Sequence, residues 1–564
     1  MSQEPSGPST MRKRLGGSTD RFGRAIRRRV AIDRRALAAF RISIAALLIA
    51  DLVGRTRLLG MFYTDAGVLP REALFSDYSS LTAYSVHTLS GAAWAQWLLF
   101  LVAGLVALAL LVGYRTRIAT IVSWLLLVSL HVRNPMVLNA GDVLLRMLLF
   151  WSIFLPLGSR WSIDARRRNP AQSSGDAAPT IATIGTIAVL LQVLLMYLTN
   201  AVHKTRSDMW MSGEAVVHIF QADHLTVLLG NVLPEYTALL EVFTYAWMVL
   251  IVLSPLLLLL TGVPRALLVT GFAGMHLGML VTLRIGLFPL IVVAGLLLFY
   301  PPVVWDTASS LATRVGLAGP LRRTLDRLQS RAPAFRIGIG NWAPGSWLHS
   351  ITSASNENSD AENATAESRS DDTNPLTAVA SRGRVFVTTI IPWLLLVLVV
   401  LSNAEAVGYT EVPDAGNEAL DTLQASQSWR MFAPNPTSTA QWFVVPGELE
   451  NGTTVDAFRG SGVDWDRPPN VDGTYETARE RKYLSNMRFA GNENHHSYYA
   501  NYLCDRWNRE HDTTLENLTV YGMSDRSGLY ADEPDISKSE VIEYDCSGEF
   551  IQEEESDAIV VTPE

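Results

Sequence analysis

Hydrophobic and polar positions divide the chain into long blocks. Residues 36–302 are mostly apolar, whereas 345–380 and 403–564 are polar and acidic. The apolar parts resolve into runs of roughly 18–22 residues, the length of helix that crosses about 30 Å of hydrocarbon. Because lipid offers the backbone no hydrogen-bond partner, such runs are predicted to be helices. We count nine of them, at 36–54, 93–113, 116–133, 141–158, 180–200, 236–260, 265–283, 286–302 and 384–402.

This pattern predicts an all-α polytopic membrane bundle of eight helices, a ninth tethering helix, and a smaller, β-rich (α+β) C-terminal domain. The expected boundaries are a basic N-terminal segment at 1–33, the bundle at 34–305, a linker at 306–383, the tether at 384–402 and the C-terminal domain at 403–564. Within the linker, 345–380 is rich in Ser, Asn, Asp and Glu and is predicted to be disordered.

Positive charge predicts the orientation of the bundle. Residues 12–29 hold a cluster of Arg and Lys, and the even-numbered connections carry further arginines, as in "ARRR" at 165–168. Cytoplasmic loops carry an excess of these residues. We therefore expect a multi-pass protein of the cell membrane with its N-terminus in the cytoplasm. Nine crossings then place the C-terminal domain outside the cytoplasm.

The C-terminal domain contains short β-like stretches, "QWFVVPG" and "LTVYGM", among polar turns. Cys504 and Cys546 are the only cysteines in the chain. Outside the cytoplasm, these cysteines either form a disulfide or remain two free thiols, and the sequence does not decide between the two. No Cys or Cys/His spacing typical of a zinc site occurs, so no metal is expected.

Composition supports a membrane protein. Hydrophobic residues make up 49% of the chain and charged residues 18%, with a mean hydropathy of +0.18. Of the 46 basic residues only four are lysines, namely Lys13, Lys204, Lys482 and Lys538. The preference for Arg, together with polar parts rich in Asp and Glu, favours a GC-rich and halophilic source. The expected partners are the lipid bilayer and an exported peptide or protein; a nucleic acid is not expected.

Ionisable residues inside apolar spans usually face a bundle interior or a water-filled cavity. Asp51, Glu241 and Arg284 lie near span ends, where structural pairing or snorkelling is the leading interpretation. Asp142 and Arg146 are four residues apart on one helical face, which predicts an intrahelical ion pair. The full set of candidates is Arg41, Asp51, Asp142, Arg146, Lys204, Glu241, His276 and Arg284.

His276 lies inside the seventh predicted span, in "GFAGMHLGML". A lone buried histidine is more often a hydrogen-bonded core residue than a catalyst. Gly271, Gly274 and Gly278 give the same span a narrow face that lets a neighbouring helix or a flat ligand approach closely. Helix packing is the leading interpretation of this face, and Gly274 and Gly278 are the candidates for contact with a cofactor.

Lys204 lies at the outer end of the fifth predicted span, beside His203. An interfacial cation that reaches the lipid headgroups is one interpretation, with Trp210 at the same level. Arginine serves that purpose equally well, and this chain uses arginine nearly everywhere. A lysine amine whose pKa falls on desolvation can accept a proton, whereas a guanidinium cannot. The rarity of lysine in this chain therefore leaves two interpretations of Lys204 equally open, an interfacial anchor and a catalytic base.

Five segments, in this order, resemble the HTTM domain family, which includes vitamin K-dependent γ-glutamyl carboxylase. They cover roughly residues 34–305, and "QSWRMFAPNP" at 427–436 resembles a segment that follows the membrane domain in many prokaryotic members. The five segments read "FRISIAALLIADL", "MFYTDAGVLP", "RNPMVLNAGDVLLRMLLFWSIFLPLGSRWSID", "MYLTNAVHKTRSDMWMSGEAV" and "MHLGMLVTLRIGLFPL".

The resemblance implies a site. In the carboxylase, a lysine at the position of Lys204 deprotonates reduced vitamin K, and the reaction with oxygen and CO2 leads to carboxylation of Glu in an exported polypeptide. Carried over, Lys204 is the initiating base and His276 a neighbour that positions the quinol or the substrate. A reduced quinone of the vitamin K or menaquinol type is the implied cofactor if the protein is an enzyme.

One departure weakens the transfer of the reaction. The carboxylase has an Asn-Asn-His stretch before the fourth span, and "NAG" at 139–141 aligns with it. Asn139 remains, whereas Gly141 takes the place of the histidine. His131, earlier in the same loop, is a candidate substitute in space.

Three functions compete. The leading one is a non-enzymatic membrane protein that binds an exported peptide or protein or assists its maturation. The alternative is a carboxylase-like enzyme that uses a quinol, with Lys204 as base. A transporter ranks last, because the chain shows no inverted repeat and no pair of broken helices.

Overall fold

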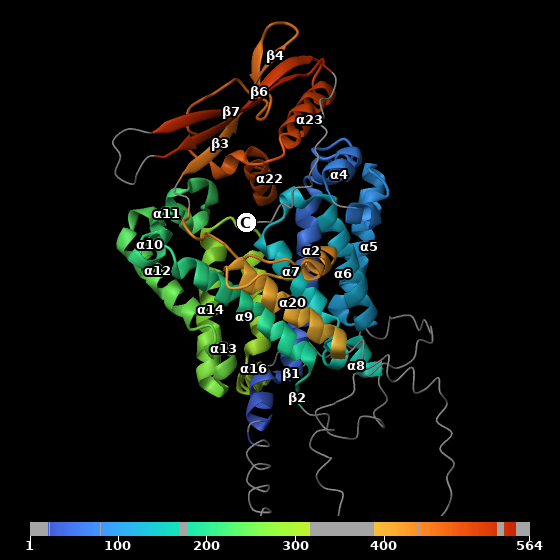
Figure 1. The fold of residues 1–564 in the computed structure, drawn as a ribbon, viewed down its shortest axis with the longest axis vertical. Coiled ribbons are helices and arrows are strands. Elements are labelled where there is room, and N and C mark those ends of the chain that lie inside the picture. The colour runs from blue at the N-terminus through green and yellow to red at the C-terminus, as the bar shows by residue number, and fades with distance from the viewer. Residues whose placement is uncertain are drawn as a thin grey trace, which may run out of the picture.

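The computed structural model describes residues 21, 23–78, 80–167, 179–315, 389–436, 439–526 and 535–548. A helical part forms the body of the molecule, and a smaller part with a β-sheet, residues 440–548, sits against one end of it (Figure 1). Of the predicted linker at 306–383, only 306–315 are described. The segment 345–380, predicted to be disordered, lies outside the described residues.

Five helices of the described chain are long and apolar enough to cross a membrane. They are α2 (Arg34–Thr56), α5 (Ala93–Val112), α6 (Thr116–Arg133), α9 (Ile184–Thr205) and α14 (Gly262–Thr282). Each overlaps a predicted span and differs from it by at most a few residues at either end. Their lengths follow from long runs of mostly apolar residues.

The other four predicted spans are shorter or broken in the structure. They correspond to α7 (Ala140–Ser152), α12 (Thr237–Val252), α15 (Phe288–Leu296) and α20 (Ile391–Ala406). Pro255 follows α12, and the segment ending at Phe299 turns by 102° into α16 (Pro302–Arg314). The predicted count of eight spans plus a ninth is therefore not confirmed.

Helix α7 shows why an apolar run need not face lipid. Every residue from Gly141 to Ser152 is buried inside the protein. Its first turn carries a capping box, in which the Asn139 side chain accepts from the amides of Gly141 and Asp142. Asp142 Oδ2 in turn accepts from the Asn139 amide at 2.9 Å. A helix that is apolar on all sides can be a core helix, and α7 is one.

Shorter elements connect the longer ones. They are β1 (Ile32–Asp33), α3 (Leu59–Tyr63), α4 (Arg71–Asp77), α8 (Ile163–Arg167), β2 (Thr180–Ile181), α10 (Asp208–Ser212), α11 (Ala215–Gln221), α13 (Leu256–Leu259) and α21 (Asp414–Thr422), with single 3₁₀ turns between several of them.

The C-terminal part is an antiparallel sheet with two helices. Strand β6 (Leu515–Asp525) pairs on one side with β3 (Ala440–Val444) and β4 (Pro446–Leu449), and on the other side with β7 (Ile536–Asp545). The remaining elements are β5 (Thr454–Asp456), α22 (Ala478–Arg488) and α23 (Asn494–Glu510). Both predicted β-like stretches lie in these strands, so a small β-sheet in this region is confirmed. A disulfide joins Cys504 on α23 to Cys546 after β7.

Helix α22 is fixed to the helical part by a buried ion-pair network. The Arg479 guanidinium donates to Asp142 Oδ1 at 2.8 Å and Oδ2 at 2.9 Å, and also to Asp51 Oδ1. Arg55 donates to the same two carboxylates, at 2.7 Å each. The network joins α2 and α7 to the C-terminal part, and it holds α22 above the ends of these helices (Figure 1).

This network corrects one prediction. Arg146 does not pair with Asp142: its Nη1 lies 3.2 Å from His131 Nδ1, while Asp142 faces two guanidinium groups from other elements. Asp51 is 4% exposed and forms ion pairs with Arg55 and Arg479, which agrees with structural pairing, although the site lies away from headgroup water. Glu241, expected in the same setting, is exposed. The spacing of two charged residues along one helix predicts a pair between them, but it does not reveal which charged residues of other helices lie closer in the folded protein.

Candidate functional site

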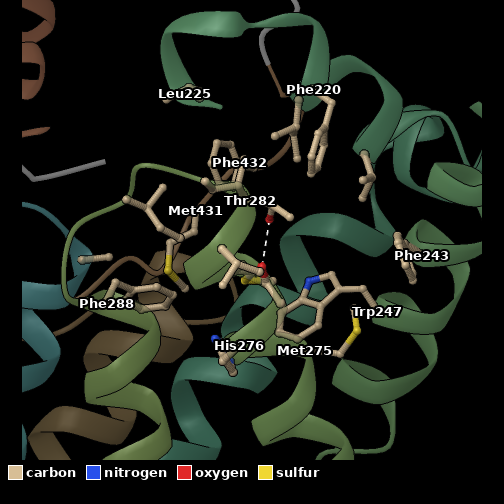
Figure 2. Close-up of a pocket in the computed structure, with 18 of the residues that line it drawn as sticks. Phe220, Leu225, Phe243, Trp247, Met275, His276, Thr282, Phe288, Met431 and Phe432 are labelled. Atoms are coloured by element: carbon tan, nitrogen blue, oxygen red, sulfur yellow. Dashed lines mark hydrogen bonds between the residues drawn. The ribbon is translucent and has the colours of Figure 1, made fainter. Parts of the chain in front are cut away.

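A cavity of about 770 Å³ lies where α9, α12 and α14 meet the C-terminal part. Its lower wall is aromatic and apolar, and Figure 2 shows Trp247, His276 and Phe288 there, with Met431 and Phe432 from a distant segment. The described lining includes the charged or titratable residues Lys204, His224, His276, Arg481 and Lys482, and it includes no Asp or Glu. The cavity therefore combines an aromatic, apolar wall with cationic side chains.

Lys204 stands on the last turn of α9 and lines this cavity. Its side chain is almost fully enclosed, with 3% of the residue exposed. The Nζ atom lies 3.6 Å from the ring centroid of Trp210 and 5.7 Å from that of Trp247. Among the described residues, no carboxylate lies within ion-pair distance of this amine. Lys204 is held over aromatic faces, which stabilise a cation without neutralising it.

His276 lies in the same cavity, on α14. Its Nε2 atom lies 3.0 Å from the Tyr197 hydroxyl, while its Nδ1 atom is buried and has no hydrogen-bond partner among the described residues. The ring packs edge-on against Trp247, at 5.5 Å between centroids. A buried polar atom without a partner is rare in folded proteins, and here it borders a cavity where a ligand can supply one.

Gly274 and Gly278 also line the cavity, and both border open space. A β-carbon added at either position would meet no atom within 4 Å. Gly271, one turn earlier, would contact Leu250 at 3.6 Å. The two glycines thus leave room in the cavity instead of packing against a helix, contrary to the leading interpretation of this face.

The structure answers the question raised by Gly141. An added β-carbon there would lie 2.9 Å from the side-chain oxygen Oδ1 of Asn139 and 3.1 Å from Phe288 Cα, so a side chain at this position requires Asn139 and Phe288 to shift. His131 does not substitute for it. Its two ring nitrogens lie 3.3 Å from Arg55 Nη2 and 3.2 Å from Arg146 Nη1, inside the ion-pair network and away from the cavity lining.

His224 is a cavity residue that sequence reasoning missed. It lies in the connection between α11 and α12, is 6% exposed, and has a buried Nδ1 atom without a hydrogen-bond partner. Burial, with the nearby charges of Arg481 and Arg467, lowers the pKa of His224 to about 3. A single histidine in an irregular connection has no periodic signal that could have singled it out.

Helix α22 forms the outer wall of the cavity. Ala478, Arg481, Lys482 and Ser485 follow the spacing of one helical face, and all four line the cavity. Arg481 Nη2 donates to the Arg284 carbonyl at 2.9 Å, and burial lowers the Arg481 pKa to about 10. Arg284, a sequence candidate, pairs with Asp472 at 2.7 Å and so links α14 to the C-terminal part.

Of the remaining sequence candidates, Arg41 is buried outside the cavity. Its guanidinium donates to backbone carbonyls, the shortest contact being 2.6 Å to Trp161. Among the described residues, no group of three or more His, Cys, Asp or Glu side chains is arranged to hold a metal ion.

The apolar helices define the protein as a membrane protein that contacts lipid, with a ligand-sized cavity at one end of its helical part. Residues 30–305 match the family model of the HTTM domain, so this part of the chain is an HTTM domain. The match includes Lys204, His276 and both cavity glycines, but neither α22 nor the segment that carries Phe432. No curated protein and no solved structure matches the chain.

Proposed function

We propose that the cavity binds a lipid-soluble reduced quinone and that Lys204 accepts a proton from its hydroxyl group. The observation that carries this proposal is the setting of Lys204: an enclosed amine, without a carboxylate partner among the described residues, in the wall of a ligand-sized cavity. An amine in such a position can act as a general base toward a phenolic hydroxyl, whereas a guanidinium cannot.

The residues present fit a flat apolar ligand. The volume of about 770 Å³ falls in the range of roughly 300–1,000 Å³ typical of small-molecule sites. Trp247 and Phe288 offer ring faces, and Gly274 and Gly278 leave space beside them. His276 Nδ1 offers one polar contact that no described residue of the protein satisfies. These groups can orient a ring so that its hydroxyl faces Lys204 Nζ.

The ligand can reach the cavity from lipid. Several lining residues on α12 and α14 are exposed, with 43% of Leu239, 37% of Phe243 and 38% of Val281 accessible, and both helices carry further exposed apolar residues such as Val249 and Leu267. Exposed apolar side chains next to an apolar cavity suit access from the bilayer better than access from water.

The outer wall supports a carboxylase-like reaction. Arg481 and Lys482 place positive charge in the wall that α22 contributes, where an acidic side chain of an exported polypeptide would be attracted. Together with oxygen and CO2, a reduced quinone supplies the chemistry by which the family's carboxylase modifies Glu. We extend the proposal to this reaction, with the N-terminus in the cytoplasm and the C-terminal part outside it.

A second candidate rests on Gly141. The position that holds an imidazole in the carboxylase is a glycine here, closely enclosed by Asn139 and Phe288, which favours a protein that binds its partner without reacting with it. In that case the protein would assist an exported peptide or protein, and the C-terminal part would provide the binding surface.

Blocking the cavity tests the quinol site. Gly278→Leu fills space that no protein atom occupies, so the variant should fold normally and bind a menaquinol-type probe about tenfold more weakly or worse. Gly104→Leu is the matched control, because Gly104 also borders open space but lies on α5, away from the cavity. Equal probe binding by both variants in lipid nanodiscs would contradict the proposed site.

The two candidates differ in their products. If the protein is an enzyme, mass spectrometry of exported proteins should find a CO2-sized mass increase on Glu that disappears when the gene is deleted. If it is a binder, deletion should leave those masses unchanged, and damage to the C-terminal part should abolish its effect on the partner.

A further inference from the structure

A segment far from α9 in sequence forms part of the Lys204 site. Residues 427–436, here called the strap, run along α9 and contribute Met431 and Phe432 to the cavity wall (Figure 2). The HTTM-domain match ends at residue 305, so the strap lies outside it. The cavity is therefore completed by residues that the family domain alone does not contain.

The strap is attached to α9 by specific hydrogen bonds. Gln192 Nε2 donates to Gln427 Oε1 at 2.7 Å, and the Trp429 indole donates to the same oxygen at 3.0 Å. Two turns further along α9, Asn200 Nδ2 donates to the carbonyls of Trp429 and Met431, at 2.9 and 3.3 Å. All the polar side chains in these contacts are buried, so water cannot replace the bonds without cost.

The strap adopts a backbone that needs this support. Trp429 and Phe432 have φ values of 50° and 54°, in the left-handed region that bulky residues rarely adopt. Such a conformation persists where the surrounding structure holds it in place. The bonds from Gln192 and Asn200 supply that support next to the cavity.

One residue connects the strap to Lys204. The Trp210 indole N–H donates to the Phe432 carbonyl at 2.9 Å, and the face of the same indole lies 3.6 Å from Lys204 Nζ. Trp210 is 1% exposed, so its ring has little freedom to move. Because no carboxylate holds the amine among the described residues, the indole is its nearest fixed partner.

We propose that the strap positions Lys204 through Trp210, so that residues 427–436 are part of the functional site. Trp210 and Gln427 are positioning residues: the first fixes the amine, and the second fixes the strap at a distance from the cavity lining. This inference rests on the proposed function only for the role of Lys204 as a base. The contacts among the strap, Trp210 and Lys204 do not depend on any ligand.

The scarcity of lysine provides a direct test. The chain has four lysines, so modification by phenyl isothiocyanate, followed by peptide mass spectrometry, reports on Lys204 individually. Trp210→Phe removes the indole N–H and part of the ring, and Gln427→Leu removes the acceptor that holds the strap. Each variant should free the amine and raise the initial modification rate of Lys204 by about fivefold to 30-fold, the scale of a cation–π contact of about 1 to 2 kcal/mol.

Two controls separate positioning from general loosening. Trp305→Phe removes a similar bond, from an indole to the Tyr300 carbonyl at 3.3 Å, but on α16. It should leave the Lys204 rate unchanged. Lys538, on β7, serves as the internal reference in every sample.

The outcomes are distinct from those of the proposed function. An increase in both variants, without quinol binding by the unmodified protein, would support the strap and contradict the quinol site. Rates in Trp210→Phe and Gln427→Leu equal to that in Trp305→Phe would overturn the inference, whether or not a quinol binds.

Discussion

Replacing Arg479 by methionine should detach helix α22 from the helical part. In the native network, the carboxylates of Asp51 and Asp142 face two guanidinium groups, from Arg55 and Arg479. Methionine has a similar length but no charge, so the variant leaves two buried carboxylates with Arg55 as their remaining ion-pair partner. The cost arises from the charge left uncompensated, not only from lost contacts.

The size of the effect follows from burial. Removing one member of a buried ion pair costs about 3–5 kcal/mol. The Arg479 side chain is 17% exposed, which admits some water, so the lower end applies. A loss of about 3 kcal/mol corresponds to a roughly 100-fold larger equilibrium constant for opening.

Hydrogen exchange detected by mass spectrometry can measure this opening. Amides of α22 should exchange about 100-fold faster in Arg479→Met, whereas those of the apolar helix α5 should not change. Arg467→Met is the matched control: Arg467 also joins the two parts, through Asp223, and it pairs with the buried Asp525, but neither of these partners lies on α22 or in the network. Its loss should therefore leave the exchange of the α22 amides nearly unchanged.

A compensating variant checks the cause. Adding Asp51→Asn to Arg479→Met removes one of the uncompensated charges and should recover part of the protection. If Arg479→Met exchanges no faster than Arg467→Met, the network does not hold α22 in place, and the reasoning is refuted.

Two further predictions concern the C-terminal part. Burial lowers the pKa of His495 to about 4. As the pH falls from about 6.5 towards 4, the unfolded chain therefore takes up a proton on this histidine and the folded protein does not. The contribution of His495 to the free energy of unfolding is complete above about pH 6.5 and declines by up to about 3 kcal/mol across this range. In His495→Gln, the urea-unfolding midpoint should depend less on pH over this range. A pH dependence equal to that of the unmodified protein would contradict this role of His495. The disulfide from Cys504 to Cys546 spans 42 residues, for which loop-closure entropy gives about 4 kcal/mol. A Cys504→Ala, Cys546→Ala double variant should unfold at correspondingly lower urea concentration, and an unchanged midpoint would rule out this contribution.

The long spans could be predicted because their signal is local. A mostly apolar run of about 20 residues sets the length of a spanning helix, and α2, α5, α6, α9 and α14 match the predicted runs closely. Helix α7 has the same composition but lies inside the protein, and the sequence does not show whether its neighbours are lipids or side chains.

The candidate site could be predicted only in part, for the same reason. Lys204 and His276 stand out because they interrupt apolar runs. Arg479 and Asp51 are 428 residues apart, and no local pattern connects them. The rarity of lysine indicated Lys204, and the same argument applies to Lys482, which the structure places in the wall of the same cavity. The spacing of Gly274 and Gly278 in the sequence is the same whether a neighbouring helix or a ligand lies against them, so the sequence does not distinguish the two.

The most direct test of the account is the rate at which the purified protein, in nanodiscs with oxygen, oxidises a menaquinol-type quinol. Lys204→Arg keeps the charge and removes the base, so it should slow the reaction by about 100-fold or more, the typical contribution of a general base. Lys538→Arg, far from the cavity lining, should react like the unmodified protein. Oxidation by Lys204→Arg at the unmodified rate would contradict the role given to Lys204.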